Sequence, residues 1–271
     1  MSEAPEAPPP PRDRQFVQSL ERGLSVIRAL SAPEPQTLSD VARATGLTRA
    51  ASRRFLLTLQ QLGYVHLDGT RFQLTPQVLE LGYAYLSSLT LPEVAQPHLE
   101  RLVEEVHESS SVSVLDGGDV VYVARVPTRS IMRVAISVGT RFPAYATSMG
   151  RVLLAGLGAE RLEDYFARAQ FQALTQHTEV DPVRLRRAIA DAGRAGYALV
   201  EDELAYGVIA LAVPVHDSAQ RVVASLNTSS HSKKTTRAVL LKSRLPMLLD
   251  VSNRISRELA RVPGLALSTR T

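Results

Sequence analysis

The chain has 271 residues, of which 45% are hydrophobic and 21% are charged. Such a length and composition suit one large or two ordinary globular domains. There is no cysteine, which excludes disulfides and thiolate metal sites and favours a reducing, cytoplasmic compartment. No uninterrupted apolar run approaches ~18 residues, so we expect no membrane span. The net charge of +4 permits a nucleic-acid partner without requiring one.

The chain starts with a proline-rich stretch, MSEAPEAPPPPRDRQ, which lacks an apolar signal core. We expect residues 1–15 to form a disordered tail. The next segment, Ser19–Leu30, has apolar residues at 20, 24, 27 and 30. These positions form one stripe and predict a helix, which Pro33 and Pro35 end.

Residues 37–65, TLSDVARATGLTRAASRRFLLTLQQLGYV, predict two helices joined by a sharp turn. Thr37 can cap the first helix, with Asp40 as its partner in a capping box. Gly46 allows the turn, and Thr48 can cap a longer helix that ends at Leu62.

The second of these helices has two chemically distinct sides on a wheel of ~100° per residue. We expect the apolar side to pack on the preceding helices; it consists of Ala51, Phe55, Leu59 and Leu62. The opposite side holds Arg49, Arg53 and Gln60, with Arg54 at its flank. From Arg43 to Arg71 the sequence has five arginines and one acid, an excess of positive charge that suits phosphate contact. The pattern predicts a helix-turn-helix.

Two short strand patterns follow, Tyr64–Leu67 and Arg71–Leu74, around an Asp68-Gly69 turn that is typical of a hairpin. We interpret this hairpin as a wing with Arg71 at its tip. A winged helix-turn-helix places its second helix in the major groove of DNA. We therefore expect Arg49, Ser52 and Arg53 at base edges or phosphates, and Arg54 and Arg71 at the DNA backbone. The alternative is a winged fold that contacts protein.

The segment Pro76–Ser88 predicts a linker helix that also pairs with its copy in a dimer, or a plain connector. Beyond Leu91, strand patterns fill the middle of the chain. Helices are expected over Pro92–Glu108, Thr147–Leu157, Pro182–Gly193 and Thr235–Ala260. Strands are expected on both sides of residues 116–119 and over Ile131–Ser137, Ala198–Asp202, Val208–Val215 and Arg221–Thr228. This order predicts an α+β domain around a central antiparallel sheet.

Several stretches resemble the IclR family of transcription regulators. FVQSLERGLSVIRAL, the helix-turn-helix and the wing resemble the start of that family. GTRFPAYATSMGRVLLA and EDELAYGVIALAVPV resemble its branch that governs protocatechuate, 4-hydroxybenzoate and β-ketoadipate catabolism. The resemblance implies a winged helix-turn-helix DNA-binding domain over residues 16–75, a linker helix over 76–90, and a GAF-like effector-binding and oligomerisation domain over 91–271.

A binding site for an anion is expected where the loop ATSMG runs into a helix near Thr147, because free N–H groups at a helix start favour a carboxylate. The resemblance implies effector-binding roles for Ser148, Met149, Ala210, Asn227 and Ser229. An acid found in the pocket of some relatives aligns with Val200, which argues against their short oxo-acid ligand. Further candidates for this pocket are Tyr122, Met132 and Arg133.

No enzyme motif accounts for the chain. Ser148 lies in A-T-S-M-G, which lacks the first glycine of a nucleophile elbow. The six histidines have no metal-ligand spacing and no pattern that connects them to Ser148. The acids Glu201, Asp202 and Glu203 are interpreted as a solvated face. We expect no catalytic site, no cofactor and no metal.

The sequence thus predicts a cytoplasmic, ligand-responsive transcription regulator. Its partners would be a palindromic operator in double-stranded DNA and a small aromatic or dicarboxylic acid, with no membrane. It would act as a homodimer or homotetramer. The alternative is a constitutive or architectural DNA-binding protein whose second domain only oligomerises.

Overall fold

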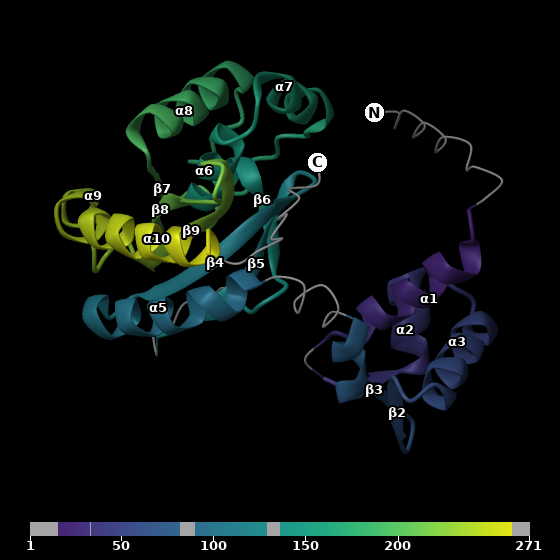
Figure 1. The fold of residues 1–271 in the computed structure, drawn as a ribbon. Coiled ribbons are helices and arrows are strands. Elements are labelled where there is room, and N and C mark those ends of the chain that lie inside the picture. The colour runs from purple at the N-terminus through teal and green to yellow at the C-terminus, as the bar shows by residue number, and fades with distance from the viewer. Residues whose placement is uncertain (1–15, 33, 82–89, 129–135, 262–271) are drawn as a thin grey trace, which may run out of the picture. The chain divides into compact units, whose positions relative to one another are not determined.

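The computed structural model describes residues 16–32, 34–81, 90–128 and 136–261. The chain divides into two compact units, residues 1–85 and 86–271 (Figure 1). Within the described ranges, no helix has both the length and the apolar character that a membrane crossing needs.

The N-terminal unit combines three helices with a small antiparallel sheet. Its helices are α1 (Gln18–Ala29), α2 (Leu38–Thr45) and α3 (Arg49–Gln61), and its strands are β1 (Gln36–Thr37), β2 (Val65–Asp68) and β3 (Arg71–Leu74). The strands lie in the order β1-β3-β2. Thr37 and Asp40 form the expected capping box, and Gly46 has a φ of +66° at the end of α2. The predicted helix-turn-helix and hairpin are confirmed; β1, with only two residues, was too short to predict.

Helix α3 packs through a different set of residues from the one that the helical wheel predicted. Ser52 and Leu56 are fully buried and Leu59 is nearly so, while Phe55 is only partly buried at the edge of the same core. Leu62 is 56% exposed and follows the last helical residue. The prediction that Leu62 packs inward is therefore wrong, because the buried side of α3 is centred nearer to Leu56.

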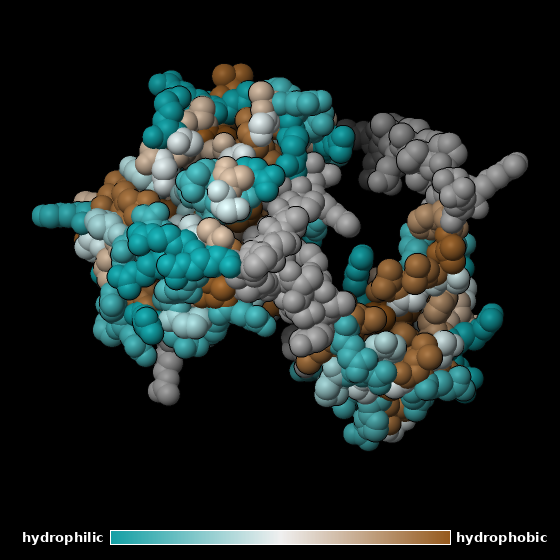
Figure 2. All heavy atoms as spheres, in the orientation of Figure 1, coloured by the Kyte–Doolittle hydropathy of each residue, from teal (hydrophilic) through white to brown (hydrophobic). Residues whose placement is uncertain are grey.

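Helix α1 is buried only in its second half. Val26 and Leu30 lie in the core, whereas Leu20 is 63% exposed and Leu24 is 43% exposed. Figure 2 shows the resulting hydrophobic surface over α1. The predicted helix is therefore present, but among the described residues only its C-terminal turns pack on the rest of the unit.

The predicted linker helix, Pro76–Ser88, begins with a single 3₁₀ turn, Pro76–Val78. Residues 79–81 continue as helix. The remaining residues of this prediction lie outside the described part of the chain.

The C-terminal unit is built on a six-stranded antiparallel sheet with the strand order β6-β5-β4-β9-β8-β7. The strands are β4 (Ser109–Asp116), β5 (Asp119–Val126), β6 (Arg141–Pro143), β7 (Ala198–Glu201), β8 (Val208–His216) and β9 (Val222–His231). This arrangement confirms the α+β domain. The short strand β6 was not predicted. The predicted strand Ile131–Ser137 lies mostly outside the described residues, and Ile136 and Ser137 are not in a strand.

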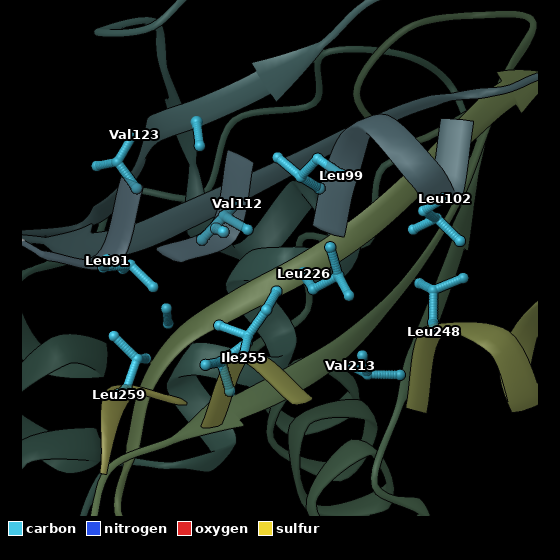
Figure 3. Close-up of a cluster of buried hydrophobic side chains, with 14 of the residues drawn as sticks. Leu91, Leu99, Leu102, Val112, Val123, Val213, Leu226, Leu248, Ile255 and Leu259 are labelled. Atoms are coloured by element: carbon cyan, nitrogen blue, oxygen red, sulfur yellow. The ribbon is translucent and has the colours of Figure 1, made fainter. Parts of the chain in front are cut away.

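Helices cover both faces of this sheet (Figure 1). α5 (Thr90–Val106) and α10 (Leu245–Leu259) pack on one face, while α6 (Ser148–Ala155), α7 (Ala159–Arg168) and α8 (Pro182–Ala195) gather on the other. Figure 3 shows the first interface, where Leu99, Val112, Leu226 and Ile255 interdigitate. Helix α7 was missed by the sequence analysis.

The predicted helix Thr235–Ala260 is confirmed as one continuous helical segment from residue 237 to 259, but it is not a regular α-helix throughout. It consists of a short turn, α9 (Arg237–Val239), a five-residue π-helical segment (Leu240–Arg244) and then α10. Pro246 stands in the first turn of α10. Because proline has no N–H group, it cannot continue a regular helical ladder from the preceding turn.

Candidate functional site

The exposed side of α3 is basic. Arg49, Arg53 and Arg54 are exposed, and in the described part of the chain none of the three has an ion-pair partner. Arg54 stands two residues from both Ser52 and Leu56, which is about 200° around the helix from each. Arg54 therefore points directly away from the core and Arg53 lies to one side, whereas Arg49, exposed in the first turn, lies within about 20° of the direction of Leu56. The predicted arrangement, with Arg49 and Arg53 opposite the core and Arg54 at the flank, is wrong.

Ser52 does not belong to this exposed surface. Its side chain is fully buried, and its hydroxyl has no hydrogen-bond partner among the described residues. Ser52 therefore cannot reach a base edge from this position, and we withdraw it from the predicted DNA-binding set. A serine in an inward position carries no hydrophobic signal, so its burial could not be predicted from the apolar pattern of the helix.

Arg71 lies beside the tip of the hairpin. The turn itself is Gly69 and Thr70, with Gly69 at a φ of +57°. Arg71 stands opposite Asp68 in the backbone ladder of the hairpin. The Nη1 of Arg71 donates to the carbonyl oxygen of Pro35 at 3.0 Å. The guanidinium is thus oriented by the protein, while its exposed N–H groups stay available to a phosphate.

Arg43 contributes less to the basic surface than its charge suggests. It forms an ion pair with Asp40, one helical turn away. Hydrogen bonds from Thr37, with the Arg43 charge as a smaller cause, lower the pKa of the Asp40 carboxyl. Of the four arginines from Arg43 to Arg54, the three on α3 are therefore the ones that have no ion-pair partner among the described residues.

Replacing Arg54 with alanine should weaken binding to a DNA duplex that the wild-type protein selects from random sequence. If the side chain reads a base, we expect the variant to lose ~1–3 kcal/mol of binding free energy. If the side chain binds phosphate, we expect affinity to fall equally for all DNA sequences and to depend less steeply on salt concentration. Fluorescence anisotropy at several salt concentrations distinguishes the two. The matched control is Arg187→Ala, on exposed α8 of the other unit. Unchanged affinity and an unchanged salt slope for Arg54→Ala would exclude Arg54 from the interface.

The second candidate site is a pocket between the sheet and α6. The structure brings all five predicted effector residues to its lining: Ser148, Met149, Ala210, Asn227 and Ser229. Tyr122 and Val200 also line it, whereas Met132 and Arg133 lie outside the described residues. These positions come from widely separated parts of the sequence. Their role in binding stays a prediction.

The roof of the pocket is the start of α6. Thr147 caps this helix by accepting a hydrogen bond from the Gly150 N–H at 2.9 Å. A side chain at Gly150 would place its Cβ about 2.0 Å from the carbonyl oxygen of Ala144, so only glycine permits this close approach. Met149 reaches the sheet, where the Ser113 hydroxyl donates to its sulfur at 3.1 Å. The helix start is thus held over the sheet.

The floor of the pocket is the face of the sheet that points toward α6. Ala210 pairs with both Val200 and Ser229 in the ladder, and the small side chain of Ala210 leaves space above the sheet. The amide oxygen of Asn227 is buried and has no hydrogen-bond partner among the described residues. Burial raises the pKa of Tyr122 to about 12. The floor is therefore largely apolar with a few polar groups, one of them without a hydrogen-bond partner among the described residues, as in small-molecule sites.

One wall of the pocket comes from the loop between β7 and β8, which contributes Leu204. Glu203 in this loop forms an ion pair with Arg151 of α6 at 2.6 Å, and both side chains are about nine-tenths buried. The Glu179 N–H also donates to Glu203, and Arg151 Nε donates to the carbonyl oxygen of Tyr145. The interpretation of Glu203 as a solvated acid is therefore wrong: it fastens the pocket wall to the roof.

Among the described residues, no group of three or more histidine, aspartate or glutamate side chains has the geometry to hold a metal ion. The polar groups at the pocket are hydroxyls, one amide and backbone N–H groups. This arrangement suits binding of a small organic anion.

Family models match both units. The model for the IclR helix-turn-helix domain matches residues 19–69, and that for the bacterial transcriptional regulator IclR C-terminal domain matches residues 83–257. The Pca regulon regulatory protein of Pseudomonas putida is 41% identical over 249 residues, which cover 91% of this chain and 86% of that protein.

Two solved structures extend this similarity. A protein from Rhodococcus sp. RHA1, described as a transcriptional regulator, has a TM-score of 0.81 and 51% identity over 90% of this chain and 99% of its own. An IclR homologue from Microbacterium hydrocarbonoxydans, solved in complex with 4-hydroxybenzoate, has a TM-score of 0.77 and 25% identity over 89% and 98% of the two chains. The chain belongs to the IclR family of bacterial transcriptional regulators.

Proposed function

We propose that this regulator binds an aromatic carboxylic acid in the pocket under α6 and controls genes for the catabolism of that acid. The observation that carries the proposal is the convergence of the five predicted effector residues on one pocket. Two relatives support it: one is named for the Pca regulon and another was solved with 4-hydroxybenzoate.

The pocket must expand to admit such a ligand. Its free volume is about 30 Å³, enough for a water molecule or two, whereas an engineered cavity that accepts benzene has ~150 Å³. Side chains that line the pocket must therefore change position when an aromatic ring enters. We infer that this change displaces α6 or the β7–β8 loop, and that the ligand thereby favours one state of the protein over another.

The winged unit would carry the response to DNA. Its unpaired arginines, Arg49, Arg53 and Arg54, suit a major-groove interface, and Arg71 suits a backbone contact by the wing. We propose that two copies bind a palindromic operator as a homodimer, alone or within a homotetramer, in the cytoplasm and without catalysis. The constitutive alternative gives no reason for a buried, unpartnered amide oxygen on Asn227, which costs free energy in the absence of a ligand.

A panel of acids tests the proposal: protocatechuate, 4-hydroxybenzoate and β-ketoadipate. A ligand at 100 times its Kd stabilises the folded state by ~2.7 kcal/mol, which raises the midpoint of unfolding by roughly 5–11 °C for a unit of this size. The shift should disappear in Asn227→Ala and persist in the control Asn253→Ala, an exposed asparagine on α10. Wild-type protein that responds to neither protocatechuate nor 4-hydroxybenzoate, the two aromatic acids of the panel, would contradict the proposed effector class.

A further inference from the structure

Arg125 of β5 lies in an environment that is unusual for an arginine. Its Nη1 donates to the Ser111 hydroxyl at 3.0 Å, but its Nε is buried and has no hydrogen-bond partner among the described residues. No acidic side chain of the described ranges forms an ion pair with it. Burial lowers the pKa of its guanidinium. A partly buried cation without a counterion is costly, and proteins keep such a group for a function.

Other arginines of this unit that are largely buried have carboxylate partners. Arg151 is paired with Glu203 at 2.6 Å, and Arg244 lies 3.5 Å from the buried Glu108. The fold therefore supplies counterions where arginine is structural. Arg125 has the Ser111 hydroxyl as its hydrogen-bond partner, where each of these two arginines has a carboxylate.

A β-bulge turns Arg125 toward the pocket side of the sheet. Side chains alternate between the two faces of a strand, so residues three apart normally face opposite ways. The pairing of β4 with β5 shifts register between Val112 and Ser113. Arg125 stands opposite Ser111, and Tyr122 stands opposite Ser113. Three residues of β5 therefore span the same distance as two residues of β4. A bulge reverses the alternation in this way. Val123 and Ala124 both belong to the core under α5 and α10, so Arg125 shares the α6 side with Tyr122.

A row of polar groups connects Arg125 to the pocket. In the sheet, Ser111 stands opposite Arg125 on one side and opposite Asn227 on the other. The guanidinium reaches along this row to the Ser111 hydroxyl, and Asn227 lines the pocket. On the other flank, Arg125 is close enough to Tyr122 for its charge to act on the Tyr122 hydroxyl. Arg125 does not itself line the pocket as it stands in this structure; it lies next to the pocket, on the same strand as the lining residue Tyr122 and one strand position from Asn227 through Ser111.

We propose that Arg125 binds the carboxylate of the effector, which supplies the missing counterion. This inference rests on the proposed function and adds the residue that selects for an acid. An arginine offers two parallel N–H donors to a carboxylate, and such charge-assisted pairs are strong where water is excluded. The Nε that lacks a partner is one of the donors for this pairing. A neutral molecule of the same shape cannot replace the counterion.

The test compares 4-hydroxybenzoate with 4-hydroxybenzamide, its uncharged isostere, by calorimetric titration of the full chain. Wild-type protein should prefer the acid, and Arg125→Met should weaken acid binding roughly 10- to 150-fold while leaving amide binding nearly unchanged. Arg125→Lys should restore part of the preference because it keeps the charge. The control Arg187→Met, at an exposed site on α8, should behave as wild type.

Thermal unfolding without ligand separates this role from a structural one. Because Arg125→Met removes an uncompensated partly buried charge, the variant should be at least as stable as the wild type. A marked fall in its unfolding midpoint, or an acid preference that survives in Arg125→Met, would overturn the assignment of Arg125 and leave the proposed function intact. A wild-type protein that binds neither 4-hydroxybenzoate nor protocatechuate would overturn both.

Discussion

Replacing Arg151 with methionine is expected to lower the unfolding midpoint of the C-terminal unit by roughly 6–20 °C. Arg151 and Glu203 form an ion pair that is about nine-tenths buried, between the roof and one wall of the pocket. Removing one member leaves the other as an uncompensated buried charge, which costs about 3–5 kcal/mol, and each kcal/mol is worth about 2–4 °C in a unit of this size. Differential scanning calorimetry of the full chain measures the change.

Two further variants make this result specific. Arg151→Met combined with Glu203→Leu removes both charges and should recover part of the lost stability. Arg254→Met breaks an ion pair with Asp250 that is more than half exposed, and it should shift the midpoint by only a few degrees, since surface pairs contribute about 0–1 kcal/mol. An Arg151→Met protein that unfolds with the same midpoint as Arg254→Met would contradict the structural role of the buried pair.

The second large effect is expected from Leu56→Ala in the N-terminal unit. Leu56 is fully buried in the small core that α3 shares with α1 and α2. A leucine-to-alanine change at such a site costs about 2–5 kcal/mol, a large part of the stability of a small domain. We expect the winged unit to unfold and DNA binding to be lost, while acid binding by the other unit is retained.

The same substitution at Leu62 provides the matched control. Leu62 belongs to the same chain segment but is 56% exposed, so Leu62→Ala should change stability by no more than about 0.5 kcal/mol. Circular dichroism during urea unfolding of both variants measures the difference. Equal destabilisation by the two variants would mean that α3 packs with the phase predicted from the sequence and not with the phase of this structure.

Short-range signals made the N-terminal unit predictable. The capping box of Thr37 and Asp40, the turn at Gly46 and the cap at Thr48 involve residues within four positions of one another, and each forms as expected. Which side of α3 is buried was harder to predict, because Ser52 occupies a core position without being hydrophobic. Elements of two or three residues, such as β1 and β6, contain too few side chains to produce a pattern.

The pocket was predictable only in part, because its contacts join distant residues. The five effector positions came from the family resemblance, and the structure explains why they occur together. Arg151 and Glu203 are 52 residues apart, so nothing in the local sequence pairs them. Arg125 was missed for a different reason: strict alternation along β5 would place it on the face opposite Tyr122, and only the bulge brings both to the pocket side.

Operator binding with and without acid tests the central claim most directly. The full chain would be titrated onto a duplex that it selects from random sequence, in the absence of ligand and with saturating 4-hydroxybenzoate or protocatechuate. We expect at least one acid to change operator affinity by roughly 5- to 150-fold, the usual scale of coupling between two sites. The Asn227→Ala variant should still bind the operator, but its affinity should no longer respond to the acid. Identical operator affinity with and without acids that the protein demonstrably binds would contradict a ligand-responsive regulator.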